Sequence, residues 1–315
     1  MKIFAALVSL GITLASPAFA APLDVAVSIV PQKYFVNRIA GDLAKVVVMV
    51  PPGGSPATYE PKPSQMVALG SSKAYFSIGV PFEKSWLPKF HSIHPSMQIV
   101  DTTIRIQRRV MGAHTHHHDA DAHGEHQHAL EAHSSHEHEE GHSLRDPHVW
   151  LSPQLVRLQA DQIRDALIRL DPRHAAEYRR GHAAFISDIH KVDEQLLNML
   201  QGQARPKPFM VFHPSWGYFA EAYGLKQYAI EVDGKTPSPK MLARMITEAK
   251  AHSIHTVFAQ PEFSQKFAKE VAKAIHGKVV RLSPLSYDWP HMMLQAGNAF
   301  SNQKTPARHE SSKLE

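Results

Sequence analysis

The chain has 315 residues, no cysteine, 23 histidines and a formal net charge of +5 when histidine is neutral. The lack of cysteine excludes disulfides, thiolate metal ligands and cysteine nucleophiles. Basic and acidic residues are interspersed without a Lys/Arg block, so the charge pattern gives no indication of nucleic-acid binding.

Residues 1–20 have the pattern of a secretory signal peptide. Lys2 is followed by a short apolar segment, Ile3 to Leu14, and by Ala18-Phe19-Ala20, an A-x-A cleavage sequence. The apolar segment is too short to span a bilayer, and no cysteine follows that could carry a lipid. We therefore expect a periplasmic protein of a Gram-negative cell, monomeric and without a membrane anchor.

Residues 21–170 are expected to form an N-terminal α/β lobe, because β-branched apolar runs alternate with helical patterns. Strands are predicted at 23–30, 45–50, 74–80 and 98–101, and helices at 32–41, 63–71 and 153–170. This alternation indicates a parallel sheet with helices on both faces.

A histidine-rich tract interrupts this lobe. Leu130 is the only large apolar residue between His114 and His142, so we expect a disordered loop over 112–145. Neutral imidazole binds zinc, copper and nickel, so the tract indicates metal handling; the alternative is a solvated linker. The accessory metal ligands that it offers are His114, His116, His117, His118, His123, His126, His128, His133, His136, His138 and His142.

A long helix is predicted over 171–203, with Asp171 as its cap and Gly202 at its end. A C-terminal α/β lobe is expected over 204–301, with a polar tail from 302 to 315. Its strands are predicted at 209–212, 228–232, 256–260 and 278–282, and its helices at 239–251 and 264–275. Two such lobes place a ligand in the crevice at the carboxyl ends of their strands.

Three motifs follow predicted strands or precede predicted helices near that crevice. They are the loop VPPGGSPATYEPKPSQ, the segment DPHVWLSP with His148, and VFHPSWGYFAEAYGL with His213. A single histidine is more often a hydrogen-bonded structural residue than a ligand. His148 and His213, however, occupy the same kind of topological position in their respective lobes.

These stretches, together with PSPKMLARMI and QPEFS, resemble the ZnuA-like zinc- and manganese-specific solute-binding proteins of ABC importers, over about residues 23–300. The resemblance implies two Rossmann-like α/β lobes joined by one long rigid α-helix, with the metal site in the crevice between them. It also implies that His148 and His213 are metal ligands.

The chain departs from that family at two positions. Ala57 stands where the family has its first histidine ligand, and Ser283 stands where it commonly has a carboxylate before Pro-Leu. Glu60 and Asp288 are predicted to supply oxygen instead, and Glu231 is a weaker option. For Asp288 a helix cap before Trp289 is an equal alternative.

The sequence thus predicts a periplasmic solute-binding protein that captures Zn²⁺ and delivers it to an ABC-type permease in the inner membrane. Mn²⁺ would favour more oxygen donors than the motifs supply, and the sequence does not exclude nickel or copper as the bound metal. The alternatives are a periplasmic zinc buffer without a permease and a zinc-dependent hydrolase with an open coordination position. The H-E-x-x-H pattern of zinc hydrolases occurs at 138–142, but inside the histidine-rich tract and not on a predicted helix, which argues against the hydrolase.

Overall fold

The computed structural model describes residues 21–111, 145–201, 206–231 and 237–302. The predicted signal peptide, the eleven histidines of the tract and the polar tail lie outside these residues. In the described part, no helix is both long and apolar enough to cross a bilayer.

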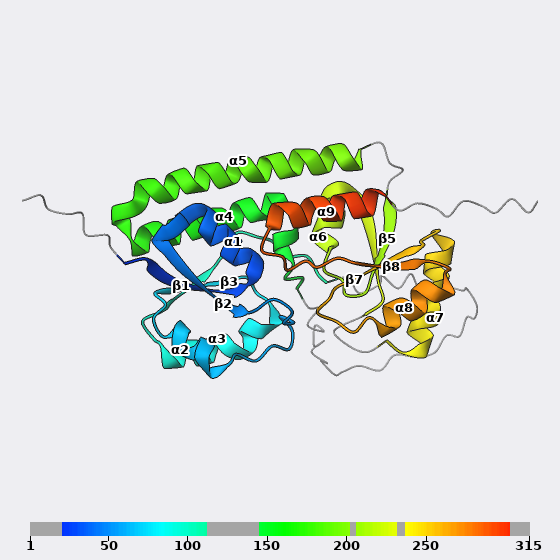
Figure 1. Ribbon diagram of the computed structural model, residues 1–315, viewed down its shortest axis with the longest axis horizontal. Helices are drawn as coiled ribbons and strands as arrows, with labels where there is room; N and C mark the ends of the chain where they lie inside the picture. Colours follow the sequence, from blue (N-terminus) through cyan, green and yellow to red (C-terminus); the bar gives the residue numbers. More distant parts are fainter. Residues whose placement is uncertain (1–20, 112–144, 202–205, 232–236, 303–315) are drawn as a thin grey trace, which may run out of the picture.

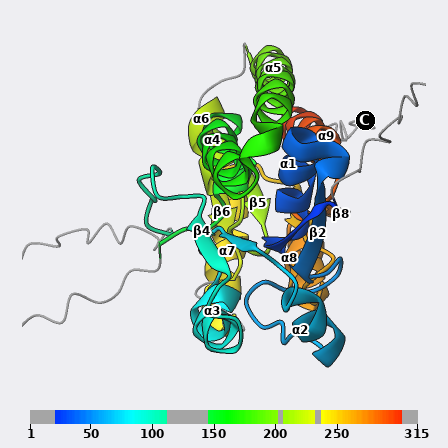
Figure 2. The ribbon, with the colours of Figure 1, turned by 90° about the vertical axis from the view of Figure 1, so that its left-hand side faces the viewer.

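The N-terminal lobe follows the predicted alternation of strands and helices (Figure 1). Its elements are β1 (Leu23–Ile29), α1 (Val30–Ala40), β2 (Ala44–Val50), α2 (Pro63–Leu69), β3 (Ala74–Ser77), α3 (Pro81–Ile93), β4 (Gln98–Asp101) and α4 (Pro153–Leu170). Helices α1 and α4 lie on one side of the sheet and α2 and α3 on the other (Figure 2).

The C-terminal lobe repeats this design. Its elements are β5 (Lys207–Val211), α6 (Gly217–Tyr223), β6 (Leu225–Ala229), α7 (Pro239–Ala251), β7 (Thr256–Ala259), α8 (Lys266–Ala274), β8 (Lys278–Arg281) and α9 (Trp289–Ser301). Each described sheet has four parallel strands, in the order β2-β1-β3-β4 or β6-β5-β7-β8. The predicted fold class, two α/β lobes and a long helix, is confirmed.

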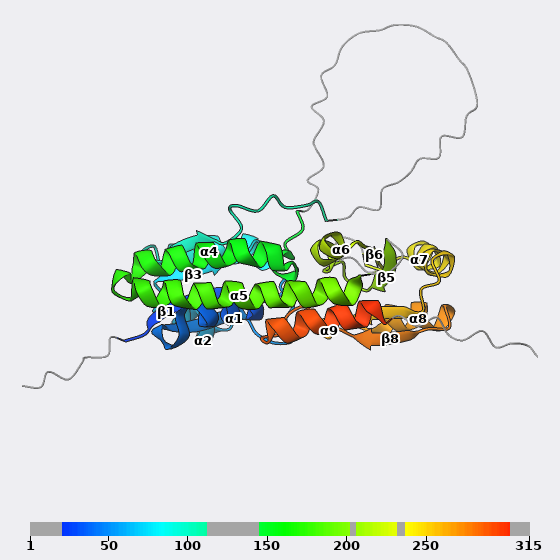
Figure 3. The ribbon, with the colours of Figure 1, turned by 90° about the horizontal axis from the view of Figure 1, so that it is seen from above.

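The long helix α5 (Ala175–Leu200) runs along both lobes, between α4 on one side and α1 and α9 on the other (Figure 3). One face of it is apolar at helical spacing and fully buried. Tyr178, Phe185 and Ile189 pack on the N-terminal side, and Leu196 and Leu200 continue the same core towards β5 and α9. One hydrophobic core therefore spans the two lobes and resists their independent movement.

Several boundaries differ from the sequence prediction, and three of the differences have a clear local cause. Strand β3 ends at Ser77 because Gly79 has a positive φ of 84° and Pro81 starts α3. Strand β6 begins earlier than predicted because left-handed Gly224 ends α6 and Leu225 pairs at once with Lys207. Asp171 precedes a 3-10 turn, and its carboxylate accepts hydrogen bonds from His174 and Tyr178 rather than capping α5.

Candidate metal site

The carboxyl ends of three neighbouring strands bring polar residues together in the C-terminal lobe. His213 follows β5, Glu231 follows β6, and Gln260 and Glu262 follow β7. Because β6, β5 and β7 are adjacent and parallel, residues after their ends share one edge of the sheet. The structure therefore gathers four polar side chains that are up to 49 positions apart in the chain.

The backbone of His213 is held by the side chain of Gln260. The amide nitrogen Nε2 of Gln260 donates to the His213 carbonyl at 3.0 Å and to Ser215 Oγ at 2.7 Å. Its oxygen accepts from the His213 N–H at 3.3 Å. The ring of Phe263 stacks on the His213 ring, with centroids 4.8 Å apart. These contacts position the imidazole before any ligand arrives.

His148 enters the same site from the N-terminal side, in the turn that precedes α4. Asp146 Oδ1 accepts from the His148 backbone N–H at 3.0 Å and lies 2.7 Å from the ring nitrogen Nδ1. The ring centroids of His148 and Trp150 are 5.1 Å apart, and the Trp150 indole N–H donates to the Pro284 carbonyl at 2.7 Å. The motif DPHVW thus carries both the histidine and the group that orients it.

Asp146 also lies where the lobes meet. Its Oδ2 is 3.8 Å from Arg109 Nε, and Arg109 reaches Glu221 on α6 at 3.4 Å. A Cβ atom on Gly217 would lie 2.8 Å from Arg109 Nη1 and 3.0 Å from Asp146 Oδ2. A side chain at this position would push the Arg109 guanidinium away from Asp146.

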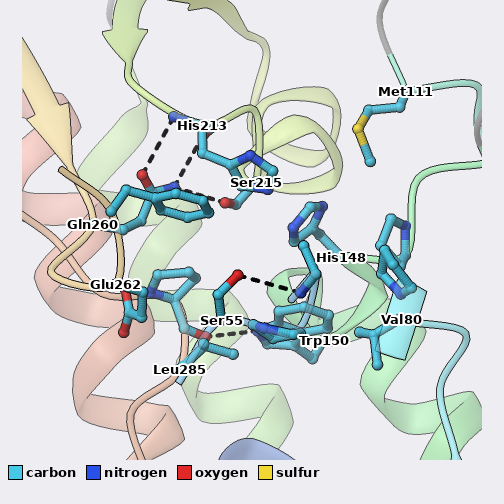
Figure 4. A pocket seen from close by; sticks show the side chains of 16 residues that line it. Ser55, Val80, Met111, His148, Trp150, His213, Ser215, Gln260, Glu262 and Leu285 are labelled. Carbon is cyan, nitrogen blue, oxygen red and sulfur yellow. Dashed lines mark hydrogen bonds between the residues drawn. The ribbon is translucent and has the colours of Figure 1, made fainter. Parts of the chain in front are cut away.

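The two imidazole rings meet edge to face at the wall of a small cavity between the lobes (Figure 4), with centroids 5.2 Å apart. The cavity has a volume of about 60 Å³. Its walls are mostly apolar, which excludes water and strengthens electrostatic interactions inside. The lining residues are Ser55, Pro56, Ala57, Val80, Pro81, Met111, Pro147, His148, Trp150, His213, Ser215, Gln260, Glu262, Phe263, Pro284 and Leu285.

Each histidine has a carboxylate at its Nδ1 atom. Asp146 holds His148, and Glu231 holds His213 through a short contact. A neutral ring that donates its Nδ1 proton to a carboxylate leaves the lone pair of Nε2 for a metal. Burial lowers the pKa of His148, against the opposing effect of Asp146, so the ring is neutral at pH 7. In both rings the carboxylate at Nδ1 favours the tautomer that leaves Nε2 for a metal.

The other sequence-predicted ligands lie elsewhere. Glu60 is exposed and does not line the cavity, although Ala57 of the same loop does. Asp288 accepts a hydrogen bond from the His291 N–H at 3.1 Å and so caps α9, which is the alternative that the sequence left open. Glu231 orients His213. No three His, Asp or Glu side chains of the described segments already converge on one metal position.

The sequence motifs contained further site residues that were not singled out. Asp146, two residues before His148, could have been found from the Asp-x-His spacing alone. Gln260, Glu262 and Phe263 belong to QPEFS, but their proximity to His213 follows only from the pairing of β5 with β7.

Comparisons with known proteins agree with this fold. The model of the family "ZnuA: Zinc-uptake complex component A periplasmic" matches residues 25–302. The high-affinity zinc uptake system protein ZnuA of Haemophilus ducreyi is 31% identical over 264 residues, which cover 83% of this chain and 84% of that protein.

Solved structures show the same fold. A crystal structure of ZnuA has a TM-score of 0.77 and 35% identity, and the match covers 90% of this chain and 99% of the other. A manganese-bound mutant of a periplasmic metal-binding protein from Candidatus Liberibacter asiaticus has a TM-score of 0.72 at 19% identity. That match covers 90% of this chain and all of the other, and it supports the fold alone. The chain therefore belongs to the ZnuA family of periplasmic metal-binding solute-binding proteins, which serve zinc or manganese uptake and are not enzymes.

Proposed function

We propose that this protein captures one Zn²⁺ ion between its lobes in the periplasm and delivers it to an ABC-type permease of the inner membrane. The observation that carries this proposal is the pair of histidines at one cavity, His148 buried and His213 partly buried, each with a carboxylate at Nδ1. Metal-binding histidines are commonly oriented by carboxylates in this way. The relative from Haemophilus ducreyi, a zinc uptake protein, supports the transport role.

The donor set favours zinc over manganese. Two imidazole nitrogens suit Zn²⁺, whereas Mn²⁺ prefers carboxylate, carbonyl and water oxygens. The carboxylates of Asp146 and Glu231 offset the charge of a divalent cation without occupying its coordination positions. The eleven histidines between His114 and His142 are proposed to raise the local zinc concentration near the site.

A competition titration tests the metal preference. The chain from residue 21 on should bind one Zn²⁺ tightly and prefer it to Mn²⁺, as the Irving–Williams order predicts for a nitrogen-rich site. Removal of residues 112–144 should preserve the tight site and lower only the number of weakly bound zinc ions. Equal affinity for Mn²⁺, or loss of the tight site with the tract, would contradict this assignment.

Delivery needs a separate measurement. Cells without the protein should take up less radioactive zinc when external zinc is scarce, and the intact gene should restore uptake. Unchanged uptake alongside tight binding would favour the zinc buffer over the transport protein.

Introducing histidine at Ala57 should tighten zinc binding. The residue lines the same cavity as His148 and His213, so a third imidazole there can complete a tetrahedral site. We expect zinc affinity to rise by about 10-fold or more, which corresponds to at least about 1.4 kcal/mol of binding free energy. Affinity should also fall more steeply below about pH 6.5, because one more imidazole must lose its proton.

Histidine at position 60 is the matched control, because Glu60 belongs to the same loop but lies outside the cavity lining. It should leave zinc affinity and its pH slope unchanged. If Ala57→His behaves like this control, the loop does not reach the metal.

A further inference from the structure

We infer that Glu262 is the carboxylate ligand of the zinc ion that His148 and His213 bind, and that Ser283 positions it. This inference rests on the proposed function, because it requires that the cavity holds a metal. It names a ligand that the sequence motifs did not point to.

Glu262 is the one acidic side chain among the residues that line the cavity. Its Oε2 atom is inaccessible to solvent and has no hydrogen-bond partner among the described residues. A buried carboxylate oxygen without a partner costs free energy, and a bound cation would remove that cost. The residues that line the cavity therefore include both nitrogen donors and a carboxylate with an unsatisfied oxygen.

The other oxygen of Glu262 is already held. Ser283 Oγ donates to Oε1 at 2.8 Å and itself accepts from the Leu285 N–H at 3.2 Å. The main chain at Leu285 thus fixes the hydroxyl, and the hydroxyl fixes one side of the carboxylate. A monodentate ligand needs only the remaining oxygen, Oε2.

Glu262 also lines the same cavity as the histidine pair, between two residues that contact His213. It stands between Gln260, which holds the His213 backbone, and Phe263, whose ring stacks on the His213 ring. The three ligands are not yet gathered around one point in the described residues, so metal binding requires them to move closer to one another. Two histidines and one glutamate leave the fourth position of a tetrahedral zinc to water.

The competing carboxylates have other surroundings. Asp146 and Glu231 are engaged by the Nδ1 atoms of the two histidines. Asp288 caps α9, and Glu60 is exposed outside the cavity lining. Of the acidic residues considered, Glu262 alone combines a place at the cavity with a free oxygen.

The test compares Glu262→Gln, Ser283→Ala and the control Glu60→Gln in the full mature chain. Loss of a group that orients a metal ligand costs about 10–100-fold in affinity, which is the effect expected for Ser283→Ala. Glu262→Gln should lose more than about 100-fold in zinc affinity by competition titration, because it removes a ligand. Glu60→Gln should match the parent. Circular dichroism should show that all variants are folded.

Cobalt substitution gives a second readout. The visible absorption of bound Co²⁺ should change in Glu262→Gln, because a coordinating oxygen is replaced, and should stay the same in Glu60→Gln. Parent-like zinc affinity and an unchanged cobalt spectrum in Glu262→Gln would overturn this inference. If His148→Ala and His213→Ala still lose binding in that case, the proposed function survives; if they bind normally, it fails as well.

Discussion

Replacing either His148 or His213 with alanine is expected to abolish tight zinc binding while the apo-protein stays folded. Each replacement removes a nitrogen ligand. Loss of a residue that only orients a ligand costs about 10–100-fold in metal affinity, so the loss here should be larger. The side chains line a cavity rather than fill the core around α5, so unfolding should change little. Competition titration and thermal unfolding of the apo-proteins measure the two effects.

Asp146→Asn and Glu231→Gln are the matched controls for this result. Each weakens the anionic partner at an Nδ1 atom but keeps the imidazole, so a loss of about 10–100-fold is expected. Unchanged zinc affinity in either alanine variant would show that this histidine is not a ligand. If the controls lose as much zinc affinity as the alanine variants, the histidines matter no more for zinc binding than Asp146 and Glu231 do.

The stability of the apo-protein should fall as pH rises from about 4.5 to 7, because of Glu83 at the start of α3. Burial raises the pKa of Glu83 from 4.5 to about 7, although Ser28, the backbone N–H groups of Ile78 and Gly79, and Arg108 oppose the shift. Between these values the folded state binds more protons than the unfolded state, so the free energy of unfolding decreases with pH. The difference corresponds to roughly 3 kcal/mol.

Urea denaturation at pH 5 and pH 8 measures this effect by comparison with Glu83→Gln, which cannot ionise. The parent should lose more stability than the variant between the two pH values. The lowered pKa of His148 reduces the free energy of unfolding only below about pH 6.5. This effect is the same in the parent and in Glu83→Gln, so it cancels in the comparison. Parallel pH profiles would show that Glu83 does not titrate in this range. Glu83 accepts hydrogen bonds from Ile78 and Gly79, which directly precede Val80 and Pro81 of the cavity wall.

Local patterns in the sequence were sufficient for most of the secondary structure. Helix α7 has the predicted bounds, because Pro239 starts it, Ser238 caps it, and its apolar residues recur at helical spacing. The alternation of strands and helices predicted two parallel sheets, and the apolar stripe of α5 predicted one long helix. These features depend on residues a few positions apart, which a sequence shows directly.

Local sequence patterns could not predict which carboxylates lie at the site. Glu60 and Asp288 were predicted from their place in motifs, yet one is exposed and the other caps a helix. Glu231 and Glu262 lie beside His213 because β6 and β7 flank β5. The order of strands in a sheet is decided by long-range packing and by the crossover connections, not by local propensity. The sequence alone therefore determined most of the elements and singled out the two histidines that line the cavity, and only the tertiary structure decided which acidic groups surround them.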